Sequence, residues 1–505
     1  MASAGKIEEL ERRRIEARGE NRKEKQHSKG KLTAWERINL LFDSGTFIET
    51  DRFLQHRCNY FGMADRKKEG DGVIAGYGRV NGRTVCAYAQ DFTVFGGSIS
   101  EMNAGKISNI QKKSLQMMVP IVGLFDSGGA RVQEGIQSLS GHGEIFFNNV
   151  KASGKVPQIS AIMGSCAGGA SYSPALTDFI LMVEGTSNMC ITGPKVVREA
   201  IGEVSSLEEL GGTKVHSSVS GIADMVAKDD AECIEYIKKL LCFLPGNFRD
   251  MPLRSNCVNY AAEKEKRISN ILPESNRRIF DVHGLIECLA DDGSVFEIKE
   301  KYARNIITAF ARIAGRAVGI VANQSLEKAG CIDIDAADKA ARFIRICDSF
   351  NIPLVNLVDV PGFYPGKDQE RRGIIRHGAK MLYAYGEATV PKITVIVRKG
   401  YGGAYLAMCS KELGADMVYA WPEAEMAVMG AKAAIEVLYK KVPQEEKTER
   451  IREYEGQFLN PYEAAHMGYV DEVITPEETR GRIIRVLESM EVRAADKMFH
   501  GNIPL

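Results

Sequence analysis

The sequence has no apolar run approaching the roughly 18 residues that a membrane-spanning helix needs. Its first residues, MASAGKIEELERRRIEARGE, carry charges with no apolar segment behind them, so they do not resemble a secretory signal. Neither sign of charge is in excess, because 66 Lys and Arg balance 66 Asp and Glu. Nucleic-acid-binding proteins usually show a basic excess, so that class is disfavoured. These absences predict a cytoplasmic protein, and a net charge near zero suits an oligomer.

Several chemical signatures are also missing. The 11 cysteines lie singly and form no C-x-x-C pair, so neither a zinc ribbon nor a redox pair is indicated, and we interpret them as small core side chains. The histidines show no metal-ligand spacing, so no metal site is predicted. The phosphate-binding Walker A sequence, the dinucleotide fingerprint G-x-G-x-x-G and the nucleophile elbow G-x-S-x-G do not occur. ATP binding, dinucleotide binding and serine hydrolysis therefore lack support.

The length of 505 residues exceeds what one core holds, since single cores stop growing at roughly 250–300 residues. We predict two domains, residues 1–250 and 251–505, joined through the polar stretch 245–278. Residues 1–40 predict a charged helical arm that is solvated or packs on a partner. From Gly72 onward two β-rich runs joined by Asn81-Gly82 predict a hairpin, and short apolar strands then alternate with helices. This alternation is typical of an α/β fold.

The second half of the chain repeats the first. VPQISAIMGSCAGGASYSPALTDFILMV, from Val156, aligns with VPKITVIVRKGYGGAYLAMCSKELGADMVYA, from Val390. PIVGLFDSGG, from Pro120, aligns with PLVNLVDVPG, from Pro353, at an offset that differs by one residue. The period is far longer than that of a solenoid repeat. We therefore predict two domains of one fold, a pairing that often builds a site at its pseudo-symmetric interface.

Two matching glycine turns are the main candidates for chemistry. Gly168-Gly169-Ala170 and Gly402-Gly403-Ala404 each stand where an apolar strand gives way to a helix. The first turn of a helix leaves its amides unpaired, and glycine lets a ligand approach the backbone. Two such amides can hold a developing oxyanion, worth roughly 3–4 kcal/mol per donor in a dry site. A single turn of this kind could also be a tight strand-helix junction that binds no ligand. The same turn in both halves of the chain favours a binding role. A third glycine turn, Asp126 to Arg131, could line the acyl or phosphate end of a ligand.

Eight segments in order resemble the carboxyltransferase family of biotin-dependent enzymes, within the crotonase superfamily. They are QDFTVFGGS from Gln90, GLFDSGGARVQEG from Gly123, MGSCAGGASYSPALTDFILMV from Met163, ITGPKVV from Ile191, EELGGTKVH from Glu208, LVDVPGFYPG from Leu357, GIIRHGAKMLYAYGEATVPKITVIVRKGYGGAY from Gly373 and YAWPEAEMAVMGA from Tyr419. The resemblance covers nearly the whole chain. It implies an α/β fold of two tandem crotonase-like domains, an acyl-CoA side in 1–250 and a biotin side in 251–505.

The resemblance also implies the chemistry and the assembly. Carboxybiotin, on a separate carrier protein, releases CO2, the biotin anion takes the α proton of an acyl-CoA, and the thioester enolate attacks CO2. No side-chain base is then needed, which suits a sequence without an acid–base cluster. Family members form ring-shaped hexamers, with the active site between the N domain of one subunit and the C domain of another.

Site residues follow from the same resemblance. Gly168 and Gly169 would hold the enolate oxygen, and Gly403 and Ala404 the ureido oxygen of biotin. The implied acyl-CoA-binding residues are Ser127, Gly128, Gly129, Ala130, Arg131, Ala167, Tyr172 and Leu406. The implied biotin-binding residues are Phe363, Gly402 and Tyr405.

The sequence departs from the family at Leu406, where several propionyl-CoA carboxylases carry aspartate, and His142 stands where tyrosine is frequent. The leading hypothesis is the carboxyltransferase subunit of an acyl-CoA carboxylase, for propionyl-CoA first and acetyl-CoA second, with biotin carboxylase and biotin carrier partners. The alternative is the α subunit of a methylmalonyl-CoA decarboxylase, with a membrane decarboxylase subunit, or of a transcarboxylase. Two further hypotheses are a non-catalytic assembly subunit and a crotonase-type hydrolase or isomerase. The latter would need a carboxylate near the Gly168 turn, and Glu184, sixteen residues further on, is too loosely placed to be adopted as that group.

Overall fold

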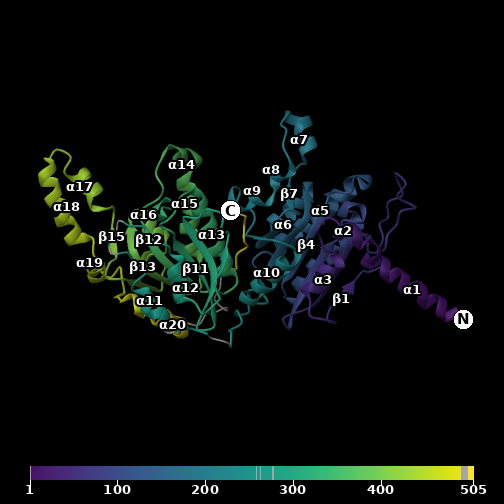
Figure 1. The fold of residues 1–505 in the computed structure, drawn as a ribbon, viewed down its shortest axis with the longest axis horizontal. Helices are drawn as coiled ribbons and strands as arrows, with labels where there is room; N and C mark the ends of the chain where they lie inside the picture. The colour runs from purple at the N-terminus through teal and green to yellow at the C-terminus, as the bar shows by residue number, and fades with distance from the viewer. Residues whose placement is uncertain are drawn as a thin grey trace. The chain divides into compact units, whose positions relative to one another are not determined.

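The computed structural model describes residues 2–256, 259–261, 263–273, 275, 278–490 and 499–504. The chain divides into two compact units, Met1–Asp250 with Phe499–Pro504, and Met251–Met498 (Figure 1). The tail Phe499–Pro504 thus belongs to the first unit, whereas the sequence prediction assigned it to the second. No helix within the described ranges is both long enough and apolar enough to cross a membrane.

The sheet of the first unit is mostly parallel. Its strand order is β1-β2-β3-β4-β5-β6-β8, with β7 paired to β5 beyond the end of β6, and only β1, β2 and β3 pair antiparallel with one another. The strands are β1 Ile48–Thr50, β2 Val73–Val80, β3 Arg83–Gln90, β4 Ile121–Ser127, β5 Gln158–Ala167, β6 Phe179–Val183, β7 Asn188–Cys190 and β8 Met225–Ala227.

The sheet of the second unit repeats this topology strand for strand. Its order is β9-β10-β11-β12-β13-β14-β16, with β15 paired to β13. The strands are β9 Phe296–Ile298, β10 Ile306–Ile313, β11 Arg316–Asn323, β12 Leu354–Val360, β13 Lys392–Tyr401, β14 Met417–Ala420, β15 Glu425–Ala427 and β16 Glu472–Val473. The predicted α/β repeat is therefore confirmed, and the repeat of the sequence is a repeat of the sheet.

The opening hairpin of each unit is fixed in the same way. Asn81 and Gly82, both at positive φ, turn β2 into β3, as the sequence predicts. Their amides donate to the two carboxylate oxygens of Asp43 at 3.0 and 2.8 Å. In the second unit Asp291 accepts from the amides of Ala314 and Gly315 at 3.0 and 2.7 Å. Asp43 and Asp291 are therefore equivalent residues of the repeat.

Helices cover both faces of each sheet. The helices of the first unit are α1 Ala2–Arg18, α2 Lys23–His27, α3 Ala34–Leu41, α4 Glu101–Met117, α5 Ile136–Ala152, α6 Tyr172–Ala175, α7 Pro194–Ile201, α8 Leu207–Gly211, α9 Thr213–Ser218 and α10 Asp230–Phe243. Those of the second are α11 Glu263–Ile268, α12 His283–Leu289, α13 Ile334–Ser349, α14 Lys367–Arg372, α15 Ile374–Glu387, α16 Gly402–Ala407, α17 Ala431–Leu438, α18 Gln444–Phe458, α19 Pro461–His466 and α20 Thr479–Ser489.

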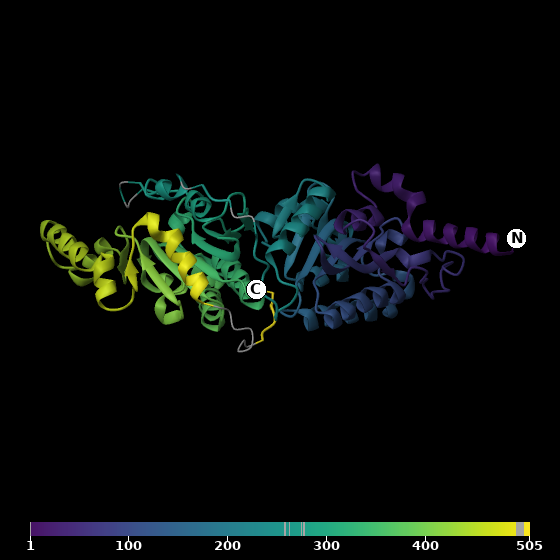
Figure 2. The same cartoon turned by 90° about the horizontal axis from the view of Figure 1, so that it is seen from below.

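Equivalent helices begin with equivalent caps. Ser100 caps α4 by accepting a hydrogen bond from the amide of Asn103, and Asp333 caps α13 by accepting from Ala336, both at 2.9 Å. The apolar sides of α4 and α5 pack on one face of the first sheet, and those of α12 and α20 on one face of the second. Figure 2 shows α20, in yellow, lying along that second sheet.

Two interpretations of the sequence need correction. Cys242 is exposed and Cys190 and Cys331 are half-buried, so these three are not core side chains, whereas seven other described cysteines are buried and Cys257 lies outside the described residues. The stretch 245–278 is not only a connection, because it contains α11, and Ile268 at the end of this helix is buried in the core of the second unit.

A charged cluster at the start of α12 predicts a pH-dependent stability. The hydrogen bond of His283 to Glu297, opposed by partial burial and supported by Asp281, raises its pKa from 6.5 to about 9. A raised folded-state pKa stabilises the fold fully below the unfolded value and loses this effect as pH rises through about 9. We expect His283→Gln to lower the urea midpoint at pH 6, and the two proteins to converge near pH 10. A midpoint difference that is constant over that range would contradict this assignment.

Candidate active site

The first glycine turn is formed where β5 ends. Ala167 is the last residue of the strand, Gly168 has φ +64, and a short 3-10 turn leads into α6. A left-handed φ is open to glycine at little cost, which explains the residue at this point. Ala167, Gly168 and Gly169 are only partly buried, so this stretch of backbone is accessible to a ligand. Tyr172 follows at the start of α6 and is 49% exposed.

The third glycine turn lies directly beside the first. Ser127, the last residue of β4, pairs with Cys166 of β5, so the two strand ends are neighbours. Gly129 has φ +95, and a Cβ there would lie 2.7 Å from the carbonyl oxygen of Ala167. Gly128 is exposed and Ala130 is half-buried. Adjacent parallel strands thus bring these predicted residues to one edge of the sheet.

Two residues predicted to bind substrate have other contacts. The hydroxyl of Ser127 is buried and accepts a hydrogen bond from the amide of Gly129 at 3.1 Å, so it shapes the turn. Arg131 is 1% exposed, and its guanidinium donates to Asp71 at 2.7 Å and to the carbonyl of Ser98 at 3.0 Å. Arg131 therefore holds the turn through contacts inside the unit.

His142 of α5 lies against the first turn. An ideal Cβ on Gly169 would be 3.3 Å from Cδ2 of the imidazole ring. Nδ1 of His142 donates to the carbonyl of Ser138 at 2.9 Å, and Nε2 is buried without a partner among the described residues. Burial lowers the pKa of His142, so the ring is neutral near pH 7. The sequence showed His142 only as an unusual residue at its position, because nothing in the motif reveals its contact with Gly169.

The second glycine turn repeats the first. β13 ends at Tyr401, Gly402 has φ +58, and α16 starts there. Gly403 and Leu406 are exposed, Ala404 is buried and Tyr405 is half-buried. Phe363 lies beside this turn, because a Cβ on Gly403 would be 3.9 Å from its ring. Phe363, Gly402 and Tyr405, which were predicted as one group, are thus brought together.

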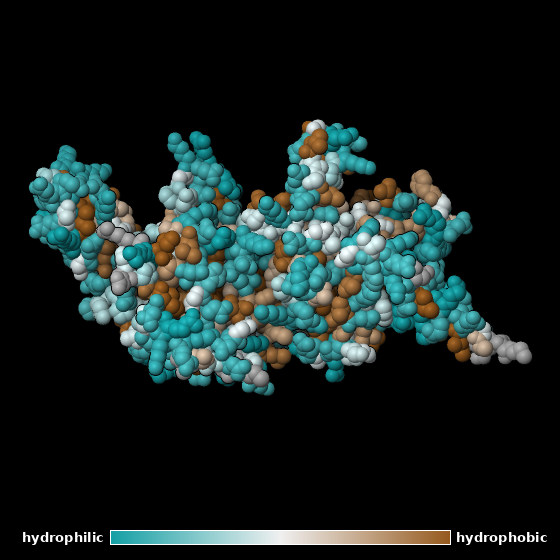
Figure 3. Space-filling view, viewed as in Figure 1, coloured by the Kyte–Doolittle hydropathy of each residue, from teal (hydrophilic) through white to brown (hydrophobic). Residues whose placement is uncertain are grey.

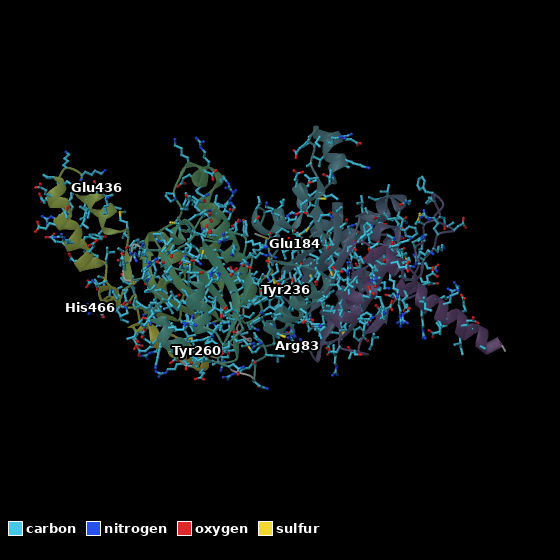
Figure 4. All side chains as sticks on the ribbon, in the orientation of Figure 1. Arg83, Glu184, Tyr236, Tyr260, Glu436 and His466 are labelled. Atoms are coloured by element: carbon cyan, nitrogen blue, oxygen red, sulfur yellow. The ribbon has the colours of Figure 1, made fainter. Side chains whose placement is uncertain are left out.

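A pocket of about 750 Å³ opens at this turn. Its lining is mostly apolar and comprises Gly400, Gly402, Gly403, Tyr405, Leu406, Met426, Ala427, Val428, Leu438, Tyr454, Phe458, Glu463, Ala464, Met467 and Tyr469. Helices α17 and α19, whose Glu436 and His466 are labelled in Figure 4, contribute part of it. No sequence motif marks these helices as part of a site, so they were not predicted to line it.

The hydroxyl of Tyr405 is buried and has no hydrogen-bond partner within the described part of the chain. Burial raises its pKa well above the ordinary value, so the group is a neutral phenol. A buried hydroxyl without a partner costs free energy, so such a group in a pocket is a candidate for contact with a ligand.

Glu184, the carboxylate considered for a hydrolase, has its backbone bonded on the side of β6 that faces away from β5. It follows β6 directly, is exposed, and its amide donates to Ala227 of β8 at 2.8 Å (Figure 4). Strand β8 lies on the side of β6 away from β5, which carries the first turn. The backbone of Glu184 is therefore bonded on the side away from that turn. The contacts of Glu184 therefore give the hydrolase hypothesis no support.

Helix α7 presents apolar side chains to solvent at its protruding end, seen as brown atoms in Figure 3. Ile201 is 71% exposed and Val204, just beyond the helix, is 82% exposed. Its equivalent in the repeat, α17, instead packs against α18. Helix α18 thus covers α17 in the second unit, but among the described residues no equivalent helix covers α7.

Comparison with known proteins agrees with these features. The carboxyl transferase domain family model matches residues 25–503. Methylmalonyl-CoA decarboxylase subunit alpha of Veillonella parvula is 54% identical over 96% of each chain. The carboxyltransferase subunit of propionyl-CoA carboxylase of Haloferax mediterranei is 51% identical over 100% of each chain.

A crystal structure of transcarboxylase 12S, with methylmalonyl-coenzyme A and methylmalonic acid bound, is 51% identical, with a TM-score of 0.94 over 99% of each chain. This match confirms the predicted fold of two tandem crotonase-like domains. With its repeated sheet, its paired glycine turns and a family match over nearly its whole length, the chain belongs to the carboxyl transferase domain family, whose members are carboxyltransferases.

Proposed function

We propose that the chain is the carboxyltransferase subunit of a biotin-dependent acyl-CoA carboxylase, which transfers a carboxyl group from carboxybiotin to the α carbon of propionyl-CoA and, less readily, acetyl-CoA. The observation that carries this proposal is the same glycine turn, after the same strand, in both units. One reaction needs two oxyanions held, on the thioester and on the ureido ring, and the repeat offers two equivalent sites.

On the acyl side, the amides of Gly168 and Gly169 hold the thioester oxygen as the enolate forms. Each donor is worth roughly 3–4 kcal/mol when water is excluded. Gly128, Gly129 and Ala130 line the substrate from the neighbouring turn, and Ala167 and Tyr172 border it. Ser127 and Arg131 support this turn from behind.

On the biotin side, the amides of Gly403 and Ala404 bind the ureido oxygen, and Phe363, Gly402 and Tyr405 hold the ring. The apolar pocket and the unpartnered Tyr405 hydroxyl fit a bicyclic ring with few polar groups. Biotin, delivered on a separate carrier protein, supplies the carboxyl group. The protein binds and orients the two substrates and keeps water away from them.

The same site can run the transfer in the opposite direction. The relative from Veillonella parvula, named as a decarboxylase subunit, is as similar to the chain as the carboxylase subunits are. The alternative function is therefore the α subunit of a methylmalonyl-CoA decarboxylase or a transcarboxylase, with a membrane decarboxylase subunit as partner in the first case. In the carboxylase, the partners are biotin carboxylase and the biotin carrier.

We further propose a homohexamer, since the related 12S structure is described as a hexamer assembly.

The test is CO2 release by the purified protein from malonyl-CoA or methylmalonyl-CoA with free biotin. We expect biotin-dependent release, faster with methylmalonyl-CoA. If folded protein releases no CO2 from either substrate, the assay is repeated with a biotinylated carrier protein. Continued absence of release would refute the function.

Leu406 offers a test of acyl-chain selection. It is 43% exposed, follows the second glycine turn and lines the pocket assigned to biotin, where the acyl group must meet the carboxylated ring. We expect Leu406→Asp to change the ratios of kcat/KM among acetyl-, propionyl- and butyryl-CoA by about 10-fold, because one methylene in a pocket is worth about 1–3 kcal/mol. Leu406→Met is the matched control. An unchanged profile would remove Leu406 from the specificity site.

A further inference from the structure

In each unit a buried aspartate stands at the end of the strand before a turn of the candidate site. Asp126 is the second-last residue of β4 and is 0% exposed; Asp359 is the second-last of β12 and is 2% exposed. They are equivalent, since PIVGLFDSGG aligns with PLVNLVDVPG. A buried carboxylate left without a compensating cation is strongly destabilising.

In the second unit the cation comes from the next strand. Arg398 of β13 is 2% exposed. It bonds both carboxylate oxygens of Asp359, with Nε at 3.1 Å from Oδ1 and Nη2 at 2.6 Å from Oδ2. A bidentate pair of this kind fixes both side chains.

In the first unit the next strand, β5, cannot supply a cation to Asp126. The residue aligned with Arg398 is Gly164, and a Cβ there would lie 2.0 Å from Oδ1 of Asp126. The cations come instead from the N-terminal segment, residues 22–37. Lys31 Nζ lies 2.6 Å and Arg37 Nη1 3.4 Å from Oδ2 of Asp126.

The exchange is reciprocal along the repeat. RINLLFDSG, ending two residues beyond Asp43, aligns without a gap with LIECLADDG around Asp291, so Arg37 is equivalent to Leu285. Leu285 is an apolar core residue at 0% exposure. The first unit therefore has an arginine in the helix, Arg37, and a glycine in the strand, Gly164. The second unit has a leucine at the helix position, Leu285, and the arginine in the strand.

The N-terminal segment 22–37 also contacts the loop 91–97, which packs on the Ser127–Gly129 turn. Arg22 pairs with Asp91 at 3.1 Å, and Lys31 Nζ lies 4.8 Å from the ring centre of Phe92. That loop in turn contacts the glycine turn, because the amide of Gly128 donates to the carbonyl of Gly96 at 2.8 Å. The segment thus contacts both the base of the Ser127–Gly129 turn and the loop packed on it.

We propose that Lys31 and Arg37 are positioning residues for the acyl-CoA turn: through Asp126 they fix the backbone of Ser127–Gly129 against the end of β5. This inference rests on the proposed function, which assigns that turn to the acyl-CoA. The sequence predicted a solvated or partner-packing arm here; α1 is indeed largely exposed, but Lys31 and Arg37 are buried.

The test compares Lys31→Met, the conservative Lys31→Arg, and Lys25→Met as a matched control on an exposed part of the same segment. We expect Lys31→Met to raise the KM for methylmalonyl-CoA by about 10-fold or more, because a small misplacement of a binding element can cost up to about 100-fold. The KM for biotin should stay unchanged. Lys31→Arg should recover most of the affinity, and Lys25→Met should match the wild type. Arg37→Leu, tested in the same way, should raise the same KM and also lower the melting temperature, because its guanidinium bonds Asp230 at 2.8 Å as well.

The outcomes separate the two claims. A wild type without biotin-dependent activity contradicts the proposed function itself. An active wild type whose Lys31→Met variant keeps the wild-type KM overturns the positioning role. The same holds if both KM values rise together with a lower melting temperature, since that pattern reports general destabilisation. If Arg37→Leu does not fold, Lys31→Met alone decides, because Lys31 lies nearer the surface at 8% exposure.

Discussion

Gly169→Val is expected to reduce biotin-dependent decarboxylation by about 100- to 1,000-fold, the loss that removal of one oxyanion donor typically causes. The new Cβ would stand 3.3 Å from Cδ2 of His142, closer than most such contacts, and the two added methyl groups need further space. Either the buried ring or the turn must shift, and the half-exposed turn is the softer of the two. The measurement is kcat with methylmalonyl-CoA and free biotin, together with the melting temperature.

Two companion variants separate crowding from chemistry. Gly143→Val, on the exposed side of α5 where nothing lies within 4 Å of the new Cβ, controls for the β-branched residue itself. Gly169→Val combined with His142→Ala removes the crowding ring. If the double variant regains stability but not turnover, the turn requires glycine for ligand approach. A single variant with wild-type rates would exclude Gly169 from the oxyanion site.

Arg398→Met is expected to have the largest effect on stability, about 3–5 kcal/mol, because it leaves the Asp359 carboxylate buried without its bidentate partner. Arg398→Met combined with Asp359→Asn should be less destabilised than the single variant, since no uncompensated charge remains. If the double variant is as unstable as the single one, the loss reflects packing of the arginine side chain instead.

The two tryptophans allow each unit to be followed separately. Trp421 is fully buried in the core of the second unit, where its indole nitrogen donates to Thr479 at 2.9 Å, and Trp35 lies in α3 of the first. In a Trp35→Phe background, the fluorescence of Trp421 during urea unfolding reports the second unit. The effect of Arg398→Met should appear there and be absent from the signal of Trp35 in the converse background.

The repeated fold could be predicted because its signals are local. The hairpin at Asn81-Gly82 needs residues that tolerate positive φ, and the apolar runs of β4 and β5 end at glycines in both halves. The glycine turns were found for the same reason. Whether each site residue performs its assigned role stays a prediction until the variants are measured.

What could not be predicted depends on contacts between distant residues. Arg131 stands in a glycine-rich motif and was expected to contact the acyl-CoA, but its guanidinium pairs with Asp71, 60 positions away in the chain. Lys31 and Arg37 looked like part of a solvated charged arm, because the carboxylate they compensate is about 90 residues further on. The signal that could have revealed them is Gly164, the strand position where the other half of the repeat carries arginine.

The return of Phe499–Pro504 to the first unit bears on how the protein is made. Asn502 bonds Ser153 and Asp178, each at 2.8 Å, and Phe499 packs on Phe248. On a ribosome that adds about 5–20 residues per second, the first unit emerges many seconds before these last residues do. The first unit therefore lacks residues 499–504 while the second unit is being synthesised. The contacts of Phe499 and Asn502 therefore form only after the second unit has been synthesised, and a change in residues 499–504 would destabilise the unit that is synthesised first.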